Sequence, residues 1–444
     1  MKSLPIVAIV GRPNVGKSTF FNAIIGRRIS IVKDTPGVTR DRIYADSTWN
    51  GKSFTLIDTG GIDTLSDDVL LSQMRTQAQL AIDTADVILL FVDARDGLLN
   101  QDMEIANMLR LANKPIIPVV NKADHQELAQ NAYEYYALGL GDPIAISSTN
   151  LLGLGDLLDE IVKRFPEDSD TQQDQNAIQV AIVGRPNVGK SSLVNKLLNE
   201  NRVMVSNIPG TTRDAIDSLF VHENGTAYNI IDTAGIRKKR AIEDESIERY
   251  SVIRSLSAIR RADVVVLMID AQDGVTQQDT KIAGIAKNEG KASIIVINKW
   301  DAIEKETGTF EKFRLEVLEK LNFISYSPTL FISALTGQRT HMLFETIDKV
   351  YAQAGKLIPT GLLNDCIGEA QLNLQTPLIG GRRLRIYYAT QTGSFPPSFL
   401  MFVNDETLLH FSYERYLENQ LRKSFGFEGT PIRFSLKERK EEDE

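Results

Sequence analysis

The sequence predicts an α/β fold in which one domain occurs twice in tandem and a small α+β domain follows. The octapeptide GRPNVGKS at residues 11–18 recurs letter for letter at residues 184–191, a shift of 184 − 11 = 173 residues. A shift of this size indicates a domain duplication rather than a short solenoid repeat. Both halves alternate short apolar runs with longer amphipathic stretches, which is typical of α/β domains. Beyond about Ala354 this alternation changes.

The buried strands of both halves are predicted from continuous Val- and Ile-rich runs. Such runs suit strands of a parallel sheet that is covered on both faces. The runs are Val87–Val92, Ile116–Val120 and Ile144–Ile146 in the first half, and Val264–Ile269, Ile294–Ile297 and Leu330–Ile332 in the second.

Length and composition set the limits of the interpretation. A chain of 444 residues is too long for one hydrophobic core and suggests roughly three domains. Its apolar fraction of 42% and charged fraction of 24% are those of a soluble globular protein, and no apolar run approaches the roughly 20 residues of a membrane span. The N-terminal strand Ile6–Val10 is broken by Gly11-Arg12-Pro13, so we expect no signal peptide and a cytoplasmic location.

Cysteine content and charge exclude further classes. The single cysteine, Cys366, excludes an intrachain disulfide framework and agrees with a reducing compartment. A net charge of −8 argues against indiscriminate nucleic-acid binding, and we expect no DNA partner. A local basic face remains compatible with this charge.

Domain boundaries are predicted from shifts in composition. Residues 166–176, PEDSDTQQDQN, offer no apolar side chain to a core and read as a flexible acidic linker. We therefore expect a first domain at 1–165, a second at 177–353, an α+β domain at 354–436 and a charged, disordered tail at 437–444. In the α+β domain the pattern predicts helices at 365–374 and 413–424 and strands at 384–389, 399–403 and 432–434.

The repeated octapeptide has the residues of a phosphate-binding loop. Glycines let the backbone turn tightly and bring N–H groups against phosphate oxygens between a strand and a helix. Lys17 and Lys190 are then expected to reach the β- and γ-phosphates, and the hydroxyls of Ser18 and Ser191 to ligate Mg²⁺. The expected nucleotide contacts here are Gly11, Arg12, Pro13, Asn14, Val15, Gly16, Lys17 and Ser18, with Gly184, Arg185, Pro186, Asn187, Val188, Gly189, Lys190 and Ser191 in the second copy.

Two further motifs follow each loop in the same order. PGVTRD and PGTTRD place Thr39 and Thr212 at 28 residues after Gly11 and Gly184, and we assign both threonines to Mg²⁺. In DTGG and DTAG, Asp58 and Asp232 are expected to hold Mg²⁺, while the N–H groups of Gly61 and Gly235 sense the γ-phosphate. The remaining contacts expected from these motifs are Thr59, Gly60 and Ile62, and Thr233, Ala234 and Ile236.

The motif NKxD predicts the choice of base. The carboxylate of Asp124 or Asp301 can accept hydrogen bonds from the N1–H and the exocyclic amine of guanine, whereas adenine would leave it unpaired. Asn121 and Asn298 can contact the base edge and brace the loop, and the stems of Lys122 and Lys299 can cover the ring. The other expected contacts are Ala123, Ser147 and Ser148, and Trp300, Ser333 and Ala334.

Hydrolysis raises a difficulty at the residue after each DxxG motif. A glutamine that orients the attacking water is expected there, but Ile62 and Ile236 occupy the positions, and neither side chain can place water. Either both domains bind nucleotide without turning it over, or the missing charge is supplied in another way.

The duplicated order of GRPNVGKS, PG(V/T)TRD, DT(G/A)G and NKxD resembles the Der, or EngA, family of translation-factor-class GTPases. The tail segments GGRRLRIYYATQ, PPSFLMFVN and YERYLENQLRKSFGFEGTPIRF are similar to that family's C-terminal KH-like domain, so the resemblance covers essentially the whole chain. It implies two Ras-like P-loop GTPase domains and a KH-like domain. The implied activity is GTP hydrolysis at two Mg²⁺ sites, with Lys17, Thr39 and Gly61, and Lys190, Thr212 and Gly235, as catalytic residues.

The resemblance also implies partners and a second cation. Family members act in assembly of the large ribosomal subunit, so we expect contact with that subunit and its rRNA, and a monomeric protein. Related GTPases with a hydrophobic residue after DxxG hold K⁺ through a phosphate-loop asparagine, and Asn14 and Asn187 occupy that position here.

The tail departs from a working KH domain in one respect. The only GxxG segment, Gly426–Gly429, leads into a strand and carries a carboxylate, so it reads as a turn rather than an RNA clamp. RNA contact would then come from Arg382, Arg383, Arg385, Arg415, Arg422 and Lys423. The alternatives left open are an RNA-binding scaffold that binds nucleotide without hydrolysis, and a membrane-linked or tRNA-modification regulator, for which the chain shows neither an anchor nor a cofactor domain.

Overall fold

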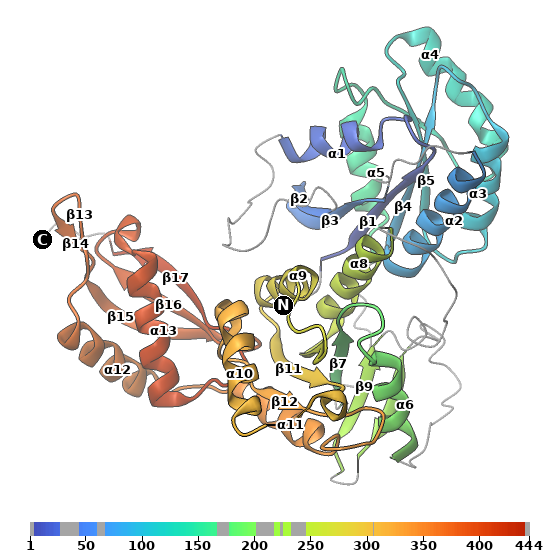
Figure 1. Ribbon diagram of the computed structural model, residues 1–444. Coiled ribbons are helices and arrows are strands. Elements are labelled where there is room, and N and C mark those ends of the chain that lie inside the picture. The colour runs from blue at the N-terminus through green and yellow to red at the C-terminus, as the bar shows by residue number, and fades with distance from the viewer. Residues whose placement is uncertain are drawn as a thin grey trace, which may run out of the picture. The chain divides into compact units, whose positions relative to one another are not determined.

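The structure is a computed structural model that describes residues 4–26, 44–59, 67–166, 177–200, 217–222, 225–231, 246–304 and 306–439 (Figure 1). The chain divides into two compact units. One contains residues 2–173 together with 244–254, and the other contains residues 174–243 and 255–444. The C-terminal domain therefore belongs to the same unit as most of the second α/β domain.

The first α/β domain is built on a six-stranded sheet. Its strand order is β2-β3-β1-β4-β5-β6, in which only β2 runs antiparallel to its neighbour. The strands are β1 (Ile6–Gly11), β2 (Tyr44–Trp49), β3 (Lys52–Asp58), β4 (Val87–Asp93), β5 (Ile116–Asn121) and β6 (Ile144–Ala145). The helices are α1 (Lys17–Gly26), α2 (Asp67–Thr84), α3 (Asn100–Arg110), α4 (Gln126–Gln130) and α5 (Leu154–Lys163), with a 3-10 turn η1 (Asn131–Leu138).

Both faces of this sheet are buried, as the continuous apolar runs predict. Alternate residues of a strand point to opposite faces, so Ala8 and Leu90 belong to one hydrophobic cluster and Ile9 and Leu89 to the other. Each cluster is completed by helices, which cover the two sides of the sheet. The sheet thus presents the carboxyl ends of β1, β4 and β5 at one edge, where loops carry the expected site residues.

The second α/β domain repeats this architecture. Its strand order, β8-β9-β7-β10-β11-β12, is that of the first domain strand for strand, again with one antiparallel edge pair. The strands are β7 (Ala177–Val183), β8 (Ser218–Val221), β9 (Ala227–Ile231), β10 (Val264–Asp270), β11 (Ala292–Asn298) and β12 (Thr329–Phe331). The helices are α6 (Lys190–Glu200), α8 (Ser246–Arg261), α9 (Gln277–Asn288), α10 (Thr309–Lys320) and α11 (Met342–Ala354), with 3-10 turns η2 (Trp300–Ala302) and η3 (Asn322–Ile324). The duplication predicted from motifs is therefore a duplication of topology.

The C-terminal domain is a three-stranded sheet with two long helices, as an α+β module. Its helices are α12 (Thr360–Asn373) and α13 (Phe411–Phe425), its sheet is β15 (Ile386–Gly393), β16 (Ser398–Val403) and β17 (Arg433–Glu438), and a hairpin β13 (Leu378–Ile379) and β14 (Arg382–Arg383) and a turn η4 (Glu406–Leu408) complete it. Helix α12 begins before the predicted 365 because Leu363 also joins the core face formed by Ile367 and Ala370.

The last strand extends into the segment that the sequence assigns to a disordered tail. β17 pairs in parallel with β16 up to the register Val403↔Glu438, so residues 437 and 438 are ordered by ladder hydrogen bonds despite their charge. Residues 440–444 and the linker residues 167–176 lie outside the described part of the chain.

The segment Gly426–Gly429 is a turn, and it packs against the second α/β domain. Gly429 donates its N–H to the Tyr326 carbonyl at 2.8 Å and accepts from the Ser293 N–H at 2.7 Å. Ser293 lies near the start of β11, whereas Asn298 lies at its carboxyl end. The C-terminal domain is therefore attached at the end of the sheet opposite the expected nucleotide site. In the parts of the chain that the structure describes, no helix has the length and apolarity of a bilayer span.

Candidate nucleotide-binding sites

The repeated octapeptide forms a tight loop between β1 and α1, and between β7 and α6. Gly11 has φ +151°, and a Cβ there would lie 2.3 Å from the Phe91 carbonyl oxygen. Gly16 has φ +92°, and its Cβ would lie 2.2 Å from Asn121 Nδ2. No side chain fits at either position, so the loop backbone requires glycine.

The second loop repeats these constraints. Gly184 and Gly189 have φ +147° and +98°, with a hypothetical Cβ 2.4 Å from the Met268 carbonyl and 2.2 Å from Asn298 Nδ2. Asn14 and Asn187 both adopt φ 64°, in the left-handed region that asparagine tolerates. Asn14 and Asn187 are exposed and follow Pro13 and Pro186, while Val15 and Val188 are buried.

The loop lysines fold back over their own loops. Lys17 Nζ donates to the carbonyls of Gly11 at 2.6 Å and Arg12 at 2.5 Å, and Lys190 Nζ donates to those of Gly184 at 2.7 Å and Arg185 at 2.6 Å. A phosphate oxygen can replace these carbonyls as the charge partner.

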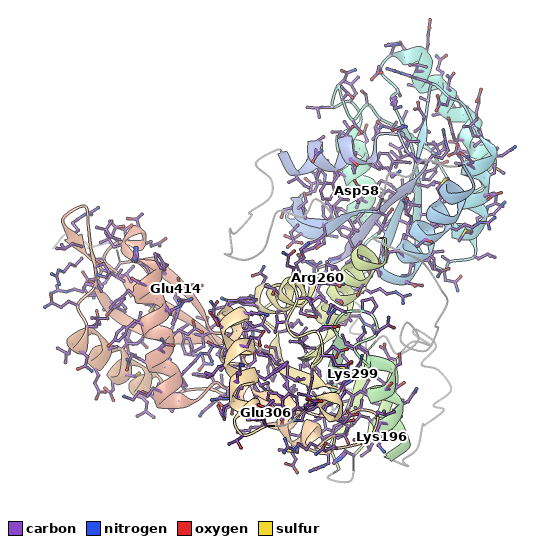
Figure 2. All side chains as sticks on the ribbon, in the orientation of Figure 1. Asp58, Lys196, Arg260, Lys299, Glu306 and Glu414 are labelled. Carbon is purple, nitrogen blue, oxygen red and sulfur yellow. The ribbon has the colours of Figure 1, made fainter. Side chains whose placement is uncertain are left out.

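Two expected Mg²⁺ ligands meet in the first site. Ser18, at the start of α1, donates its hydroxyl to Asp58 Oδ2 at 2.7 Å, and Asp58 ends β3 (Figure 2). The next residue, Thr59, is buried and donates its hydroxyl to the Ile9 carbonyl at 2.5 Å. A hydroxyl and a carboxylate are the oxygen ligands that Mg²⁺ prefers, so this pair fits the ion. In the second site Ser191 is described, whereas Asp232 is not.

The asparagine of NKxD connects the phosphate loop to a neighbouring loop. Asn121 donates from Nδ2 to the Val15 carbonyl at 2.8 Å, and its Oδ1 accepts from the N–H and hydroxyl of Ser148 at 3.0 and 2.9 Å. Ala123 donates its N–H to the Ile146 carbonyl at 3.0 Å. The side-chain amide of Asn121 therefore holds the phosphate loop and the loop at Ser148 together.

The second asparagine makes the equivalent contacts. Asn298 donates to the Val188 carbonyl at 2.8 Å and accepts from the Ala334 N–H at 2.9 Å. Trp300 donates its backbone N–H to the Ile332 carbonyl at 3.1 Å, and its ring is buried. The two backbone contacts are preserved in the second domain, and only the hydroxyl contact of Ser148 is lost where Ala334 takes its place.

The lysine of NKxD pairs with an aspartate that the motifs alone did not indicate. Lys122, at φ 64°, places Nζ 2.5 Å from Asp93 Oδ2, and Lys299, at φ 61°, pairs with Asp270. Asp93 ends β4 and Asp270 ends β10. Their shift of 270 − 93 = 177 equals the NKxD shift of 298 − 121 = 177, so comparison of the chain with itself could have found the pair.

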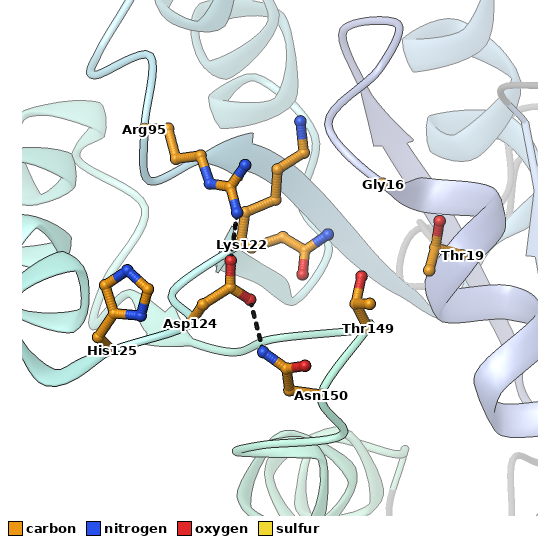
Figure 3. A pocket seen from close by; sticks show the side chains of 9 residues that line it. Gly16, Thr19, Arg95, Lys122, Asp124, His125, Thr149 and Asn150 are labelled. Atoms are coloured by element: carbon orange, nitrogen blue, oxygen red, sulfur yellow. Dashed lines mark hydrogen bonds and ion pairs between the residues drawn. The ribbon is translucent and has the colours of Figure 1, made fainter.

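Asp124 lies in a cavity of about 560 Å³ at the carboxyl edge of the first sheet (Figure 3). Ser147 donates its hydroxyl to Oδ1 at 2.6 Å, Asn150 donates to the same oxygen at 3.1 Å, and the Arg95 guanidinium pairs with Oδ2. The hydrogen bonds from Ser147 and Arg95 lower the pKa of Asp124, so the carboxylate is held ionised. The cavity is lined by Gly16, Thr19, Arg95, Asn121, Lys122, Asp124, His125, Thr149 and Asn150.

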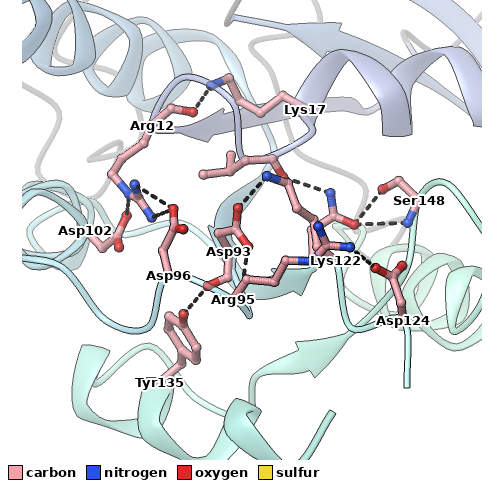
Figure 4. A network of polar contacts seen from close by, with 12 residues as sticks. Arg12, Lys17, Asp93, Arg95, Asp96, Asp102, Lys122, Asp124, Tyr135 and Ser148 are labelled. Carbon is pink, nitrogen blue, oxygen red and sulfur yellow. Dashed lines mark hydrogen bonds and ion pairs between the residues drawn. The ribbon is translucent and has the colours of Figure 1, made fainter. Parts of the chain in front are cut away.

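In both domains the octapeptide arginine pairs with an aspartate in the first turn of a later helix, α3 or α9, and Figure 4 shows the pair of the first domain. Arg12 donates from Nε to Asp102 Oδ1 at 2.8 Å and lies 3.4 Å from Asp96. Burial raises the pKa of Asp102, which is fully enclosed, and Arg12 opposes that shift. Arg12 and Arg185 are predicted nucleotide contacts, but their guanidinium groups pair with carboxylates of the chain.

The second domain repeats this ion pair. Arg185 places Nε 3.2 Å from Asp279 and Nη2 3.1 Å from Asp273. The shift from Asp102 to Asp279 is again 279 − 102 = 177 residues. Burial likewise raises the pKa of Asp279. The repeat of Asp102 as Asp279 is the sequence signal that could have predicted the partner of each octapeptide arginine.

Several expected site residues lie outside the described residues. They are Thr39, Gly60, Gly61 and Ile62 in the first domain, and Thr212, Asp232, Thr233, Ala234, Gly235 and Ile236 in the second. Ser333 is described and buried, and its hydroxyl accepts the Thr336 N–H at 3.1 Å. Asp301 is described and exposed.

The basic residues that the sequence assigns to RNA contact differ in exposure and in their partners. Arg382, Arg383, Arg385, Arg415 and Lys423 are exposed. Arg422 instead donates to the carbonyls of Phe427 at 2.5 Å and Thr430 at 2.9 Å, and stacks 4.4 Å from the ring centroid of Tyr326. Arg422 therefore holds the domain interface, which corrects its assignment to RNA.

Comparisons with known proteins agree with the duplicated site. The sequence family described as 50S ribosome-binding GTPase matches residues 6–122 and again residues 179–299. The family described as KH-domain-like of EngA bacterial GTPase enzymes, C-terminal, matches residues 357–437. "GTPase Der" of Ruminiclostridium cellulolyticum is 59% identical over 99% of both chains. This chain belongs to the GTPase Der family.

Further matches place the family assignment in context. "GTPase Der" of Acetivibrio thermocellus is 58% identical over 99% of both chains. A crystal structure of Aquifex aeolicus Era bound to GDP.AlF4- is 25% identical and covers 58% of this chain and 92% of its own, at a TM-score of 0.31. The assignment rests on the full-length relatives. As a Der-family protein, the chain is a GTP hydrolase with two tandem P-loop GTPase domains and a C-terminal KH-like domain.

Proposed function

We propose that this Der-family GTPase uses guanine nucleotide at two Mg²⁺ sites to control its association with the large ribosomal subunit during assembly of that subunit. One observation carries the proposal: two geometrically matched pairs of phosphate loop and NKxD loop share a chain with a KH-like domain that is fixed to the second α/β domain. The description of the matching family as 50S ribosome-binding supports the choice of partner.

Each described site residue has a role in this proposal. Asp124 and Asp301 accept from the N1–H and amine of guanine, and Asn121 and Asn298 hold the loops against one another. The phosphate loops surround the β-phosphate with N–H groups, and Lys17 and Lys190 exchange their carbonyl partners for phosphate oxygens. This exchange places a positive charge beside the group that is transferred.

The cations complete the charge at the phosphates. Mg²⁺ would be held by Ser18, Thr39 and Asp58, and by Ser191, Thr212 and Asp232, and when bound it neutralises charge on the β- and γ-phosphates. K⁺ at Asn14 and Asn187 would add the positive charge that Ile62 and Ile236 cannot supply. The N–H groups of Gly61 and Gly235 sense the γ-phosphate.

The chemistry of the KH-like domain supports an RNA partner. The exposed Arg382, Arg383 and Arg385 stand close in sequence to Tyr387 and Tyr388, which are 42% and 46% exposed and can stack on unpaired bases. A local cationic and aromatic face suits structured RNA in a chain whose net charge is −8.

Sedimentation with purified ribosomal subunits tests this function. The full chain, loaded with a non-hydrolysable GTP analogue or with GDP, is pelleted with large and with small subunits. We expect the large subunit to retain more of the analogue-bound chain, and the small subunit to serve as the control. Equal retention in both nucleotide states, or no preference for the large subunit, contradicts the proposal.

A further inference from the structure

The carboxylate that is proposed to read guanine in the first domain already has cationic and polar partners from the chain itself. The Arg95 guanidinium pairs with Asp124 Oδ2, while Ser147 and Asn150 occupy Oδ1. Figure 3 shows Arg95 reaching into the cavity from the loop after β4. The base and the guanidinium would therefore use the same oxygen and the same space.

Arg95 and the carboxylate it pairs with differ in exposure. The Arg95 side chain is 58% exposed, whereas that of Asp124 is 13% exposed. The N–H of Arg95 is fixed, because it donates to Asp93 Oδ1 at 3.0 Å, the aspartate that also pairs with Lys122. The backbone at residue 95 is thus anchored while the long side chain can swing into solvent.

The second domain has the same loop without the arginine. The first loop reads VDARDG at residues 92–97 and the second reads IDAQDG at 269–274, so Gln272 takes the place of Arg95. The anchoring contact is preserved, since the Gln272 N–H donates to Asp270 Oδ1 at 3.0 Å. Among the residues that the structure describes, none makes a hydrogen bond or ion pair with the Asp301 carboxylate.

We propose that Arg95 is an internal competitor for the base-reading carboxylate, which lowers the affinity of the first site for guanine nucleotides and has no counterpart in the second. This proposal rests on the proposed function, because it assumes that Asp124 reads guanine. The apparent dissociation constant of a site equals its intrinsic dissociation constant divided by the fraction of molecules in which the site is open. An exposed ion pair is a weak competitor, so we expect an effect of about three- to fivefold.

The test removes the competitor from one site and introduces it into the other. Two full chains are compared, one with Asp301→Asn alone and one with Asp301→Asn and Arg95→Gln. Asp301→Asn disables guanine binding at the second site, so titration with methylanthraniloyl-GDP measures the affinity of the first site. We expect Arg95→Gln to bind about three- to fivefold tighter, and the ratio to shrink as KCl rises because salt screens exposed pairs. In chains carrying Asp124→Asn, Gln272→Arg should weaken the second site by a similar factor.

A thermodynamic cycle provides the matched control. In the Asp124→Asn chain the competed carboxylate is absent, so Arg95→Gln should leave the affinity for methylanthraniloyl-XDP unchanged. The proposal that Arg95 competes with guanine is wrong if the Arg95→Gln chain binds GDP as tightly as the chain with Arg95. It is also wrong if the Arg95→Gln chain binds more weakly, because the arginine would then stack on the base. Absence of GDP binding in both chains would instead overturn guanine recognition at this site, so the two failures are distinguishable.

Discussion

Arg12 Nε lies 2.8 Å from Asp102 Oδ1, and this ion pair joins the phosphate loop to the first turn of α3. The Arg12 carbonyl also accepts from Lys17 Nζ at 2.5 Å. One residue therefore connects the backbone of the loop, its lysine and a fully buried carboxylate. The matched pair of Arg185 and Asp279 gives the second domain the same connection.

Arg12→Ala should destabilise the first domain and weaken its nucleotide affinity. Removal of one partner leaves a buried charge uncompensated, at a cost of about 3–5 kcal/mol. Thermal unfolding and GDP titration measure the two effects. The Arg12→Ala/Asp102→Asn chain should recover much of the stability, since no buried charge remains. Unchanged unfolding of Arg12→Ala at pH 7.5 would contradict this role.

The same variant should lose its stability in a pH-dependent way. Burial raises the pKa of Asp102 in the folded state, and loss of Arg12 removes a cation that opposes this shift. A carboxyl with a raised folded pKa favours folding at low pH, and that contribution is lost as pH rises through the raised pKa. The stability deficit of Arg12→Ala should therefore be smaller near pH 5 than near pH 7.5. An equal deficit at both pH values would exclude Asp102 as its cause.

Asp124→Asn and Asp301→Asn should each exchange guanine for xanthine at their own site. The amide donor then faces the donors of guanine, which forfeits about 1.5–3 kcal/mol per charge-assisted bond, whereas xanthine presents a carbonyl there. Competition between GTP and XTP measures the change. Full GTP affinity in the Asp124→Asn chain, without a gain for XTP, would falsify the base assignment.

Potassium should accelerate hydrolysis relative to sodium at matched ionic strength. Ile62 and Ile236 cannot place water, and a cation near the β–γ bridge can neutralise the charge that develops. Asn14→Ala and Asn187→Ala should each abolish the difference at their own site, measured as phosphate release with the other site disabled. Since Asn14 has φ 64°, Asn14→Gly serves as a control that avoids backbone strain. Equal rates in both salts contradict the idea.

Gly429→Ala should loosen the KH-like domain from the second α/β domain. Gly429 has φ +75°, and a Cβ there would lie 2.5 Å from Val350, so the substitution combines backbone strain with overpacking of about 1–3 kcal/mol. Thermal unfolding and limited proteolysis measure the loss. Gly381→Ala is the matched control, because Gly381 has φ +78° and nothing within 4 Å of its Cβ. Equal effects of the two substitutions would exclude the Val350 contact.

The sequence predicts the fold of the two α/β domains well because the same apolar runs and motifs occur in the same order in both halves. Short Val- and Ile-rich runs such as Val264–Ile269 favour strands covered on both faces, and the order of motifs indicates which strand ends carry the site. The predicted start of the disordered C-terminal tail, residue 437, lies inside strand β17. Ladder pairing with β16 orders Lys437 and Glu438, and local charge gives no sign of that long-range contact.

Site residues could be predicted only where they belong to a recognisable motif. The octapeptide indicated Lys17 and Ser18, but the long-range partners of its neighbours were hidden. Asp102 lies 90 residues from Arg12 and is joined to it only in the folded domain. The interface role of Arg422 was missed for the same reason, because an arginine on a helix shows no sign in the sequence of the Tyr326 ring beneath it.

Ribosome association should weaken when Arg382, Arg383 and Arg385 become alanine. Arg382 lies 3.0 Å from Asp405, Arg383 contacts Gln375, and all three arginines are exposed, so phosphate can replace these weak partners. Each lost phosphate contact lowers the slope of log affinity against log salt by about 0.7–0.9. Pelleting with large subunits across a salt series measures both the affinity and the slope.

The control for charge alone is a triple alanine variant of α10, at Lys312, Arg314 and Lys320, which removes the same number of exposed cations from the second α/β domain. We expect this variant to bind with nearly the slope of the unsubstituted chain, because charge far from the RNA acts only through a screened field. If both triple variants lose the same affinity and slope, net charge rather than a KH-domain face determines binding. If the KH-domain triple binds as before while the nucleotide dependence persists, the switch stands and the RNA lies on another surface.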